Sequence, residues 1–140
     1  QYGGRLWVGA GSDHTDREAE KYGVSVSKQM CDKPIAAEFW DYTEVAPHWD
    51  RLMLRAHISE NGARTLYQEG SVAAMLDPLA LIEQFAGQAG LAENTLMFCG
   101  TLAARGGIRP SDDFAFELDD PVLARKIHHR YRVHDLPILG

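Results

Sequence analysis

A strong hairpin signal near the middle of the chain limits the folds open to it. Apolar and polar residues alternate from Leu52 to Ile58, which is the pattern of a half-buried strand. The run Glu60–Ala63 follows and contains Asn61-Gly62, a dipeptide typical of two-residue hairpin turns. We therefore expect residues 64–70 to pair back on the first strand, with antiparallel sheet dominating this region.

Further elements are predicted on both sides of this hairpin. Asp77-Pro78 predicts a helix with proline in its first turn, running to about residue 88. Asp13 followed by Asp16 predicts an N-cap and a short helix over residues 14–21. Residues 127–133 fit a helix or a strand, and their β-favouring side chains favour the strand. The other expectations are strands at residues 6–10, 95–99 and 114–118, and a strand or a short helix at residues 24–30.

The expected architecture is α+β and β-rich, an antiparallel or mixed β-roll with one good helix and one short one. Its 140 residues, 45% of them hydrophobic, predict one domain spanning residues 1–140. The chain opens without an initiator methionine, and Gly3-Gly4-Arg5 is typical of a hairpin turn whose first strand is missing. We therefore interpret it as the C-terminal part of a larger domain. The unpaired strand edge predicts a homodimer or association with a missing N-terminal segment.

Composition and charge argue against several classes of partner. The net charge of −6 argues against nucleic-acid binding, which requires a basic face. The basic run at residues 125–132 is typical of a solvated strand or helix face rather than a phosphate patch. No apolar run reaches the ~18–20 residues of a membrane span, and no charged-then-apolar leader is expected. Cys31 and Cys99 form no C-x-x-C pair, so a reducing cytoplasm is expected.

Two adjacent residues after the first predicted strand have chemistry suited to a site. Asp13 is expected either to bind a hard cation such as Mg²⁺ or Mn²⁺ through oxygen, or to cap the helix that follows. His14 is a candidate general base, because the ordinary pKa of histidine, near ~6.5, suits proton transfer at neutral pH. An exposed position in the first turn of the helix is the alternative for His14.

Three further positions complete the candidate site. Arg17 is expected either to orient a substrate carboxylate or to form an ordinary ion pair with Asp13 or Asp16. Lys28 stands in a neutral, partly apolar stretch, so it either binds an enolate or carboxylate oxygen or lies exposed on a loop. Gly100-Thr101 ends the strand predicted at 95–99, where a hydroxyl and backbone N–H groups could hold a carboxylate. A plain turn is the alternative there.

Three segments carry a resemblance to a known family. Ser12–Glu18 resembles an Asn-Asp-x-Ser-Ala-Arg-Asp segment and Ser27-Lys28 resembles a Lys-Ser-Phe-Asp segment. Phe98–Thr101 with Gly106–Asp112 resembles a Gly-Thr…Leu-x-Pro-Gly-Asp segment. In this order the segments resemble those of the fumarylacetoacetate hydrolase superfamily. The run from residue 7 to residue 33 resembles a bacterial branch of it with no assigned activity.

The resemblance implies a fold and an activity. The superfamily fold is a mixed β-roll, usually dimeric, and its members cleave or rearrange acylpyruvates and related oxo acids with Mg²⁺ or Mn²⁺. By this resemblance Asp13 would bind the metal, while Arg17 and Lys28 would contact the substrate or the developing charge. Thr101 would bind the substrate carboxylate, with Gly100 beside it. The chain would then be a divalent-metal-dependent hydrolase or lyase.

The sequence also departs from the superfamily pattern. Ser12 replaces the usual Asn, and Asp16 stands where Ala is common. Superfamily members carry a Glu-x-Glu pair upstream of the Asp segment, and no such pair precedes Asp13 here. Asp13 is then one of three expected protein ligands. The alternative function is a non-catalytic oxyacid-binding or structural module with an incomplete metal site.

Overall fold

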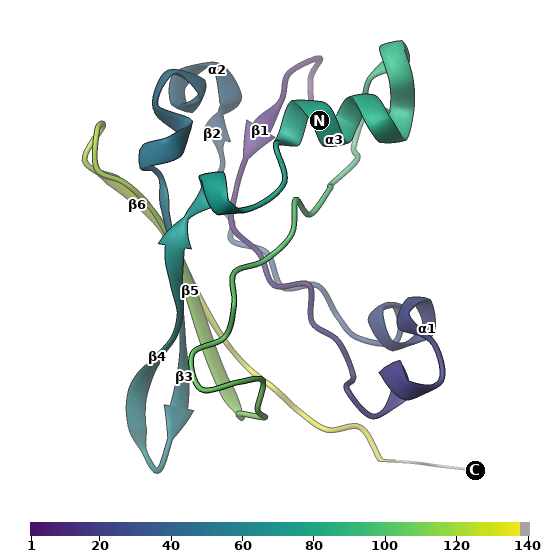
Figure 1. Ribbon diagram of the computed structural model, residues 1–140, viewed down its shortest axis with the longest axis vertical. Helices are drawn as coiled ribbons and strands as arrows, with labels where there is room; N and C mark the ends of the chain where they lie inside the picture. Colours follow the sequence, from purple (N-terminus) through teal and green to yellow (C-terminus); the bar gives the residue numbers. More distant parts are fainter. Residues whose placement is uncertain (138–140) are drawn as a thin grey trace.

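The computed structural model describes residues 1–137, and a four-stranded antiparallel sheet is its largest element (Figure 1). The strand order is β4-β3-β5-β6, so two hairpins meet along β3 and β5. A second antiparallel sheet holds two short strands. The strand bounds are β1 Trp7–Val8, β2 Trp40–Asp41, β3 Met53–Glu60, β4 Ala63–Ser71, β5 Asp113–Asp120 and β6 Arg125–Arg132.

The hairpin predicted around Asn61-Gly62 is confirmed. β3 and β4 pair from Glu60↔Ala63 back to Met53↔Ser71, with one irregularity between Ala56 and His57. Asn61 has φ of 51° and Gly62 has φ of 78°. Two consecutive positive φ angles are what a type I′ turn requires, and Asn and Gly adopt them at low cost. The strands expected around residues 114–118 and 127–133 are also confirmed, as β5 and β6.

The helices are few and short. In α3 the Asp77 side chain accepts a hydrogen bond from the Ala80 N–H at 2.8 Å, and Pro78 occupies the first turn, as predicted. The α-helices are α1 Val24–Gln29, α2 Tyr42–Val45 and α3 Pro78–Ala86. Short 3₁₀ helices cover Ala19–Lys21, Ala46–Arg51, Val72–Ala74 and Gly87–Ala89.

The helix expected over residues 14–21 is wrong. Only Ala19–Lys21 is helical, as one 3₁₀ turn. The capping side chain is Asp16, whose Oδ1 accepts from the N–H groups of Glu18 at 2.9 Å and Ala19 at 3.0 Å. The Asp16 N–H, which a cap at Asp13 would bind, donates to the Ser27 carbonyl at 3.1 Å instead, so no helix starts at Asp13. For residues 24–30 the sequence allowed a strand or a short helix, and the structure has the helix α1 there.

The strand expected at residues 95–99 is also wrong. No residue from 91 to 112 belongs to a strand, although the segment runs beside β4 and the residues after it. Leu76 N–H donates to the Cys99 carbonyl at 3.1 Å, and Arg105 N–H donates to the Tyr67 carbonyl at 2.7 Å. Between these two contacts β4 ends and passes into the 3₁₀ helix Val72–Ala74, so no straight strand edge is available for a ladder.

The four-stranded sheet has one apolar and one polar face, because side chains alternate along its strands. Most of the remaining chain lies on the apolar side (Figure 1). The opposite face carries charged side chains such as Arg55, Glu117 and Lys126. The buried core cluster consists of Ala10, Ala36, Trp40, Val45, Leu52, Ala56, Ile58, Tyr67, Val72, Phe116, Leu118 and Ile127.

A buried carboxylate closes the end of the β5–β6 hairpin. Asp120, the last residue of β5, is 0% exposed. Its Oδ1 accepts from the N–H groups of Val122 and Leu123, each at 3.1 Å, and lies 2.9 Å from His48 Nε2. Its Oδ2 accepts from Arg125 Nε at 3.2 Å. These four contacts satisfy a charge that would otherwise be costly to bury.

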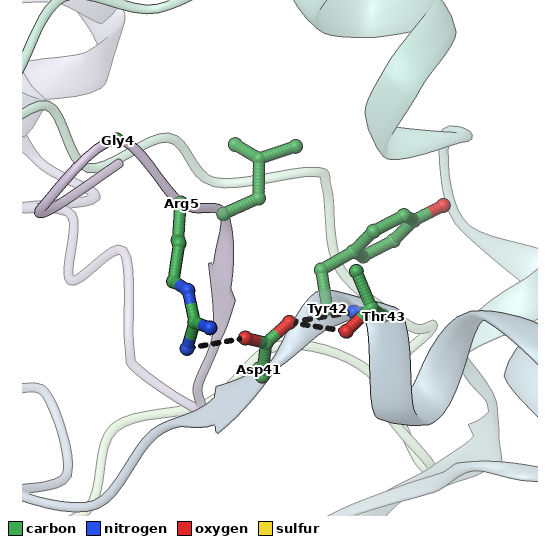
Figure 2. A pocket seen from close by; sticks show the side chains of 6 residues that line it. Gly4, Arg5, Asp41, Tyr42 and Thr43 are labelled. Carbon is green, nitrogen blue, oxygen red and sulfur yellow. Dashed lines mark hydrogen bonds and ion pairs between the residues drawn. The ribbon is translucent and has the colours of Figure 1, made fainter.

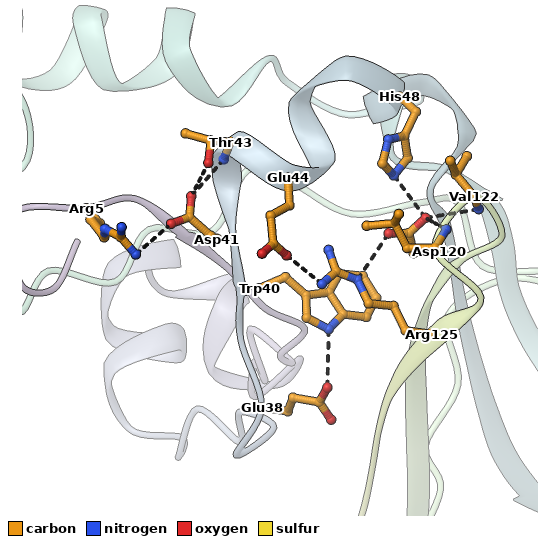
Figure 3. A network of polar contacts seen from close by, with 11 residues as sticks. Arg5, Glu38, Trp40, Asp41, Thr43, Glu44, His48, Asp120, Val122 and Arg125 are labelled. Carbon is orange, nitrogen blue, oxygen red and sulfur yellow. Dashed lines mark hydrogen bonds and ion pairs between the residues drawn. The ribbon is translucent and has the colours of Figure 1, made fainter.

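Arg125 extends this cluster to α2 and β2. Figure 3 shows its guanidinium group between the carboxylates of Asp120 and Glu44. The distance from Arg125 Nη1 to Glu44 Oε2 is 2.6 Å, and the guanidinium carbon lies 4.5 Å from the centre of the Trp40 ring. The cluster therefore joins the two sheets through charge pairing and cation–π stacking.

The described residues thus form an α+β fold with two antiparallel sheets and few short helices. All strand pairs are antiparallel. Within residues 1–137, no helix is both long enough and apolar enough to span a bilayer.

Candidate functional site

Asp13 lies between two lysines, Lys28 and Lys33, which belong to α1 and to the loop that follows it. The Asp13 carboxylate pairs with Lys28 Nζ through Oδ2, and its Oδ1 lies 3.4 Å from Lys33 Nζ. Lys28 belongs to the last turn of α1, and Lys33 follows in the loop before Pro34. These three side chains are 29–40% exposed, so solvent reaches the charges.

Backbone contacts explain why these residues meet. Ser12 N–H donates to the Pro34 carbonyl at 2.9 Å, and Asp16 N–H donates to the Ser27 carbonyl at 3.1 Å. The segment that carries Asp13 is therefore bound at both ends to the segment that carries the lysines. Lys33 Nζ strengthens the junction by donating to the His14 carbonyl at 2.5 Å and to the Lys28 carbonyl.

His14 faces β6 rather than solvent. Its ring lies edge-to-face with that of Tyr131, 5.9 Å between centroids, and its Nδ1 lies 3.3 Å from the Tyr131 hydroxyl. That hydroxyl donates to Ser12 Oγ at 2.9 Å. Burial, with the charges of Lys33 and Arg17, lowers the pKa of His14, so its imidazole is neutral at pH 7 and can accept a proton.

The charges of this cluster do not cancel. Two ammonium groups, Lys28 and Lys33, face the single carboxylate of Asp13, which leaves one positive charge in excess. Burial raises the pKa of Asp13, but hydrogen bonds and charge from the two lysines lower it by more, so Asp13 is ionised at neutral pH. These three side chains together therefore carry one net positive charge in a chain whose net charge is −6.

The other predicted site residues do not contact the Asp13 carboxylate. The charge of Arg17 acts on His14, but Arg17 Nη1 pairs with Glu20 Oε2 at 2.7 Å, rather than with Asp13 or Asp16. Thr101 Oγ1 accepts from Gln68 Nε2 at 2.9 Å, next to β4. Gly100 precedes it with φ of 107°. β4 and β6 are opposite edges of the sheet, so Thr101 is anchored at one edge and His14 at the other.

Asp13 alone does not fit a site for Mg²⁺ or Mn²⁺. Among the residues that the structure describes, no three His, Cys, Asp or Glu side chains gather closely enough to hold a metal ion. The Asp13 oxygens already face two ammonium groups. Hard divalent cations take six or more oxygen ligands, several of them from protein or water, so these residues do not assemble the expected metal centre.

Two residues of the cluster were not predicted from the sequence. Lys33 lies in a charged and proline-containing loop, where a lysine is ordinarily solvated. The sequence predicts a strand for Tyr131, but it does not predict the contact with His14, because the two residues are more than 110 positions apart. No local pattern carries this information, because both contacts depend on how distant segments pack.

A separate hollow of about 280 Å³ lies at the end of the small sheet, where β2 meets α2 (Figure 2). Its main polar groups are Arg5 and Asp41, whose ion pair measures 3.1 Å. Asp41 also accepts from the N–H and hydroxyl groups of Thr43 at the start of α2. Since these groups are paired with one another, their role here is to cap α2 and to tie it to the strand before it.

Comparisons with known proteins correct the family assignment. Residues 1–131 match the model of a family described as "Protein of unknown function (DUF2848)". Neither the comparison with curated proteins nor that with solved structures found a match. The resemblance to the fumarylacetoacetate hydrolase superfamily is therefore wrong, together with the interpretation of the chain as the C-terminal portion of such an enzyme. The family match covers residues 1–131 of the 140, and the chain belongs to this family of unknown function.

Proposed function

We propose that the chain binds a small oxo acid at Asp13, His14, Lys28 and Lys33. The observation that carries this proposal is the pairing of two ammonium groups with one carboxylate beside a neutral imidazole. The excess positive charge attracts a carboxylate, and the partial exposure of both lysines lets a small anion reach them. Charge-assisted hydrogen bonds to a carboxylate are among the stronger polar contacts in proteins.

The neighbouring groups suit the second functional group of such a ligand. The Tyr131 hydroxyl donates to Ser12 Oγ, so the neutral His14 ring donates from Nδ1 to that hydroxyl and keeps Nε2 as an acceptor. The enol form of an oxo group next to the carboxylate can donate to this nitrogen. We therefore favour a 2-oxo acid over a simple carboxylic acid.

Pyruvate, the simplest 2-oxo acid, is expected to bind this site and to shift the NMR signals of His14. Lys28→Met should weaken pyruvate binding by about tenfold or more, because a hydrogen bond to a charged group is worth about 1.5–3 kcal/mol. Lys21→Met is the matched control, since Lys21 pairs with Glu18 on the surface and is 65% exposed. Equal affinity in both variants, or no pyruvate binding to the unaltered chain, contradicts the proposal.

A second candidate function is a hydrolase or lyase acting on an acylpyruvate-like substrate. The lowered pKa of His14 favours it, because a neutral imidazole can take a proton from a substrate or a water molecule. Lys28 would stabilise negative charge as it develops on an oxygen. A requirement for Mg²⁺ or Mn²⁺ stays a prediction that needs ligands besides Asp13.

Turnover of acetylpyruvate, followed by the loss of its enol absorbance, tests this second function with and without added Mg²⁺ or Mn²⁺. Lys28→Met should lower turnover by about 10²-fold, as for the removal of one oxyanion-stabilising donor, and should change binding less. Asp13→Ala should lower Mn²⁺ affinity if Asp13 is a ligand. Unchanged Mn²⁺ affinity removes Asp13 from any metal site, and unchanged turnover in Lys28→Met removes Lys28 from the chemistry.

We also propose that the chain acts as a homodimer in a reducing cytoplasm. Support comes from the small sheet, where each strand has one partner within the described residues, and from the free thiols of Cys31 and Cys99. Unpaired strand edges favour association. Apolar side chains near the site are also exposed, including Tyr22 at 93% and Val26 at 61%. Sedimentation equilibrium measures the association.

A further inference from the structure

The polar face of the four-stranded sheet contains a hollow of about 350 Å³. Ala115 of β5 lies between His57 of β3 and Arg130 of β6 in the strand register. Longer side chains surround the methyl group of Ala115, so the hollow forms where the side chain on this face is smallest. We call it the outer-face hollow, and its polar lining consists mainly of His57, Arg64, Asp113, His128 and Arg130.

Cationic and donor groups dominate this lining. Arg130 holds Asp113 through a two-pronged contact, with nitrogen–oxygen distances of 2.7–3.0 Å, which neutralises that carboxylate. Arg64 forms no ion pair with a carboxylate in the part of the chain that the structure describes. Its Nη2 instead donates to His57 Nδ1 at 3.0 Å. Because His57 Nδ1 accepts this hydrogen bond, the proton of a neutral His57 lies on Nε2, which can then donate to a ligand.

The remaining carboxylates of this face are also occupied. Glu117, opposite His128 in the register, pairs with Arg55 and Lys126 at 3.3 Å each. Glu69 of β4 pairs with Arg55 at 2.9 Å and with Arg105 at 2.8 Å. Asp119 of β5 pairs with Arg55 at 3.1 Å. The acidic groups that could repel an anion from the hollow are therefore neutralised by other partners.

We propose that the outer-face hollow binds a phosphate group, either free or on a small organic molecule. Its donors come from Arg64 on β4, His57 on β3 and His128 on β6, and thus from both sides of Ala115. β3 and β6, which carry His57 and His128, lie two positions apart in the sheet, or about 10 Å, a span that an anion between them can bridge. Arg64 extends from β4 to the same space, because its Nη2 contacts His57 Nδ1. A tetrahedral oxyanion presents oxygens in several directions, whereas a flat carboxylate is satisfied by one guanidinium fork.

The hollow is separate from the oxo-acid site because the two lie on opposite faces of the sheet. Tyr131 of β6 points to the Asp13 side, where it contacts His14. Its neighbour Arg130 points to the other face and lines the hollow, as alternate residues of a strand do. A variant that disables one site should therefore leave the other intact, which separates this proposal from the proposed function.

Titration of the chain with inorganic phosphate, in an amine buffer at low and constant ionic strength, tests the proposal. Phosphate should shift the ring NMR signals of His57 and His128 and should raise the pKa of His57. Burial and the charge of Arg64 lower that pKa in the chain without phosphate. The charged or titratable groups facing His57 are Arg55, Arg64, Glu69, Asp113, Glu117, His128 and Arg130. Glycerol phosphate distinguishes an organic phosphate ligand by binding more tightly than inorganic phosphate.

Arg64→Gln should weaken phosphate binding by tenfold or more. Arg51→Gln is its matched control, because it removes the same charge from an exposed position outside the hollow and should change affinity by less than twofold. Ala115→Leu should fill the hollow and abolish binding, while Lys28→Met should leave it unchanged. Thermal melting establishes that each variant folds. Equal losses in Arg64→Gln and Arg51→Gln, or phosphate binding without any shift of His57, would overturn the proposal.

Discussion

Asp120→Ala is expected to lower the free energy of unfolding by about 3–5 kcal/mol, the range for breaking one side of a buried charge pair. Asp120 is fully buried and accepts hydrogen bonds from two backbone N–H groups, His48 and Arg125. Its removal leaves the Arg125 guanidinium group with one carboxylate instead of two (Figure 3). Urea denaturation followed by circular dichroism measures the change.

Asp50→Ala is the control for this variant, because Asp50 is exposed in the 3₁₀ helix that contains His48. An exposed substitution of this kind changes stability by about 0.5 kcal/mol or less. A loss for Asp120→Ala no larger than that for Asp50→Ala would mean that the cluster in Figure 3 contributes little to the fold.

The contribution of Asp120 should also depend on pH. Burial raises the pKa of Asp120, but hydrogen bonds from the Leu123 N–H, His48 and Arg125 lower it by more, to below the ordinary value of 3.8. The unfolded chain therefore binds the proton more readily. The stabilisation is complete above the unfolded pKa and is lost as the pH falls through the lower, folded-state pKa. The difference in stability between the unaltered chain and Asp120→Asn should shrink in this acidic range.

Ile127→Ala is expected to lower the free energy of unfolding by about 2–5 kcal/mol. Ile127 is 0% exposed and lies opposite Leu118 across β5 and β6. The alanine removes apolar contacts and leaves a cavity that a packed sheet cannot fully close. Ile108→Ala is the matched control, because Ile108 is 64% exposed and should lose much less. Equal losses in the two variants, measured by urea denaturation, would contradict the placement of Ile127 in the core.

The elements predicted correctly from the sequence are those whose signals are local. Asn61-Gly62 specifies a turn through its own backbone preferences, and Asp77-Pro78 starts α3 through a cap and a fixed φ. The alternation of residues in β5 and β6 reflects a sheet with one buried face. The predicted α+β class with antiparallel sheet follows from these signals alone.

Predictions from local sequence signals were wrong where a contact with a distant residue determined the conformation. Asp13 has the spacing of a helix cap, but Asp16 caps the turn and Asp13 pairs with Lys28. The apolar run at residues 95–99 has the composition of a strand, but the strand it lies beside ends at Ser71. In both cases a competing contact, rather than intrinsic propensity, determines the conformation.

The candidate site shows the same difference between what local sequence predicts and what distant contacts determine. The sequence by itself determined which chemistry the chain carries near Asp13: a carboxylate, an imidazole and a lysine within a short stretch. Only the tertiary structure decided which groups meet. It brings Lys33 and Tyr131 to Asp13 and His14, and it anchors Thr101 beside β4 instead. The physical reason is that charge pairing and packing act through space, between segments whose separation along the chain leaves no periodic pattern in the sequence.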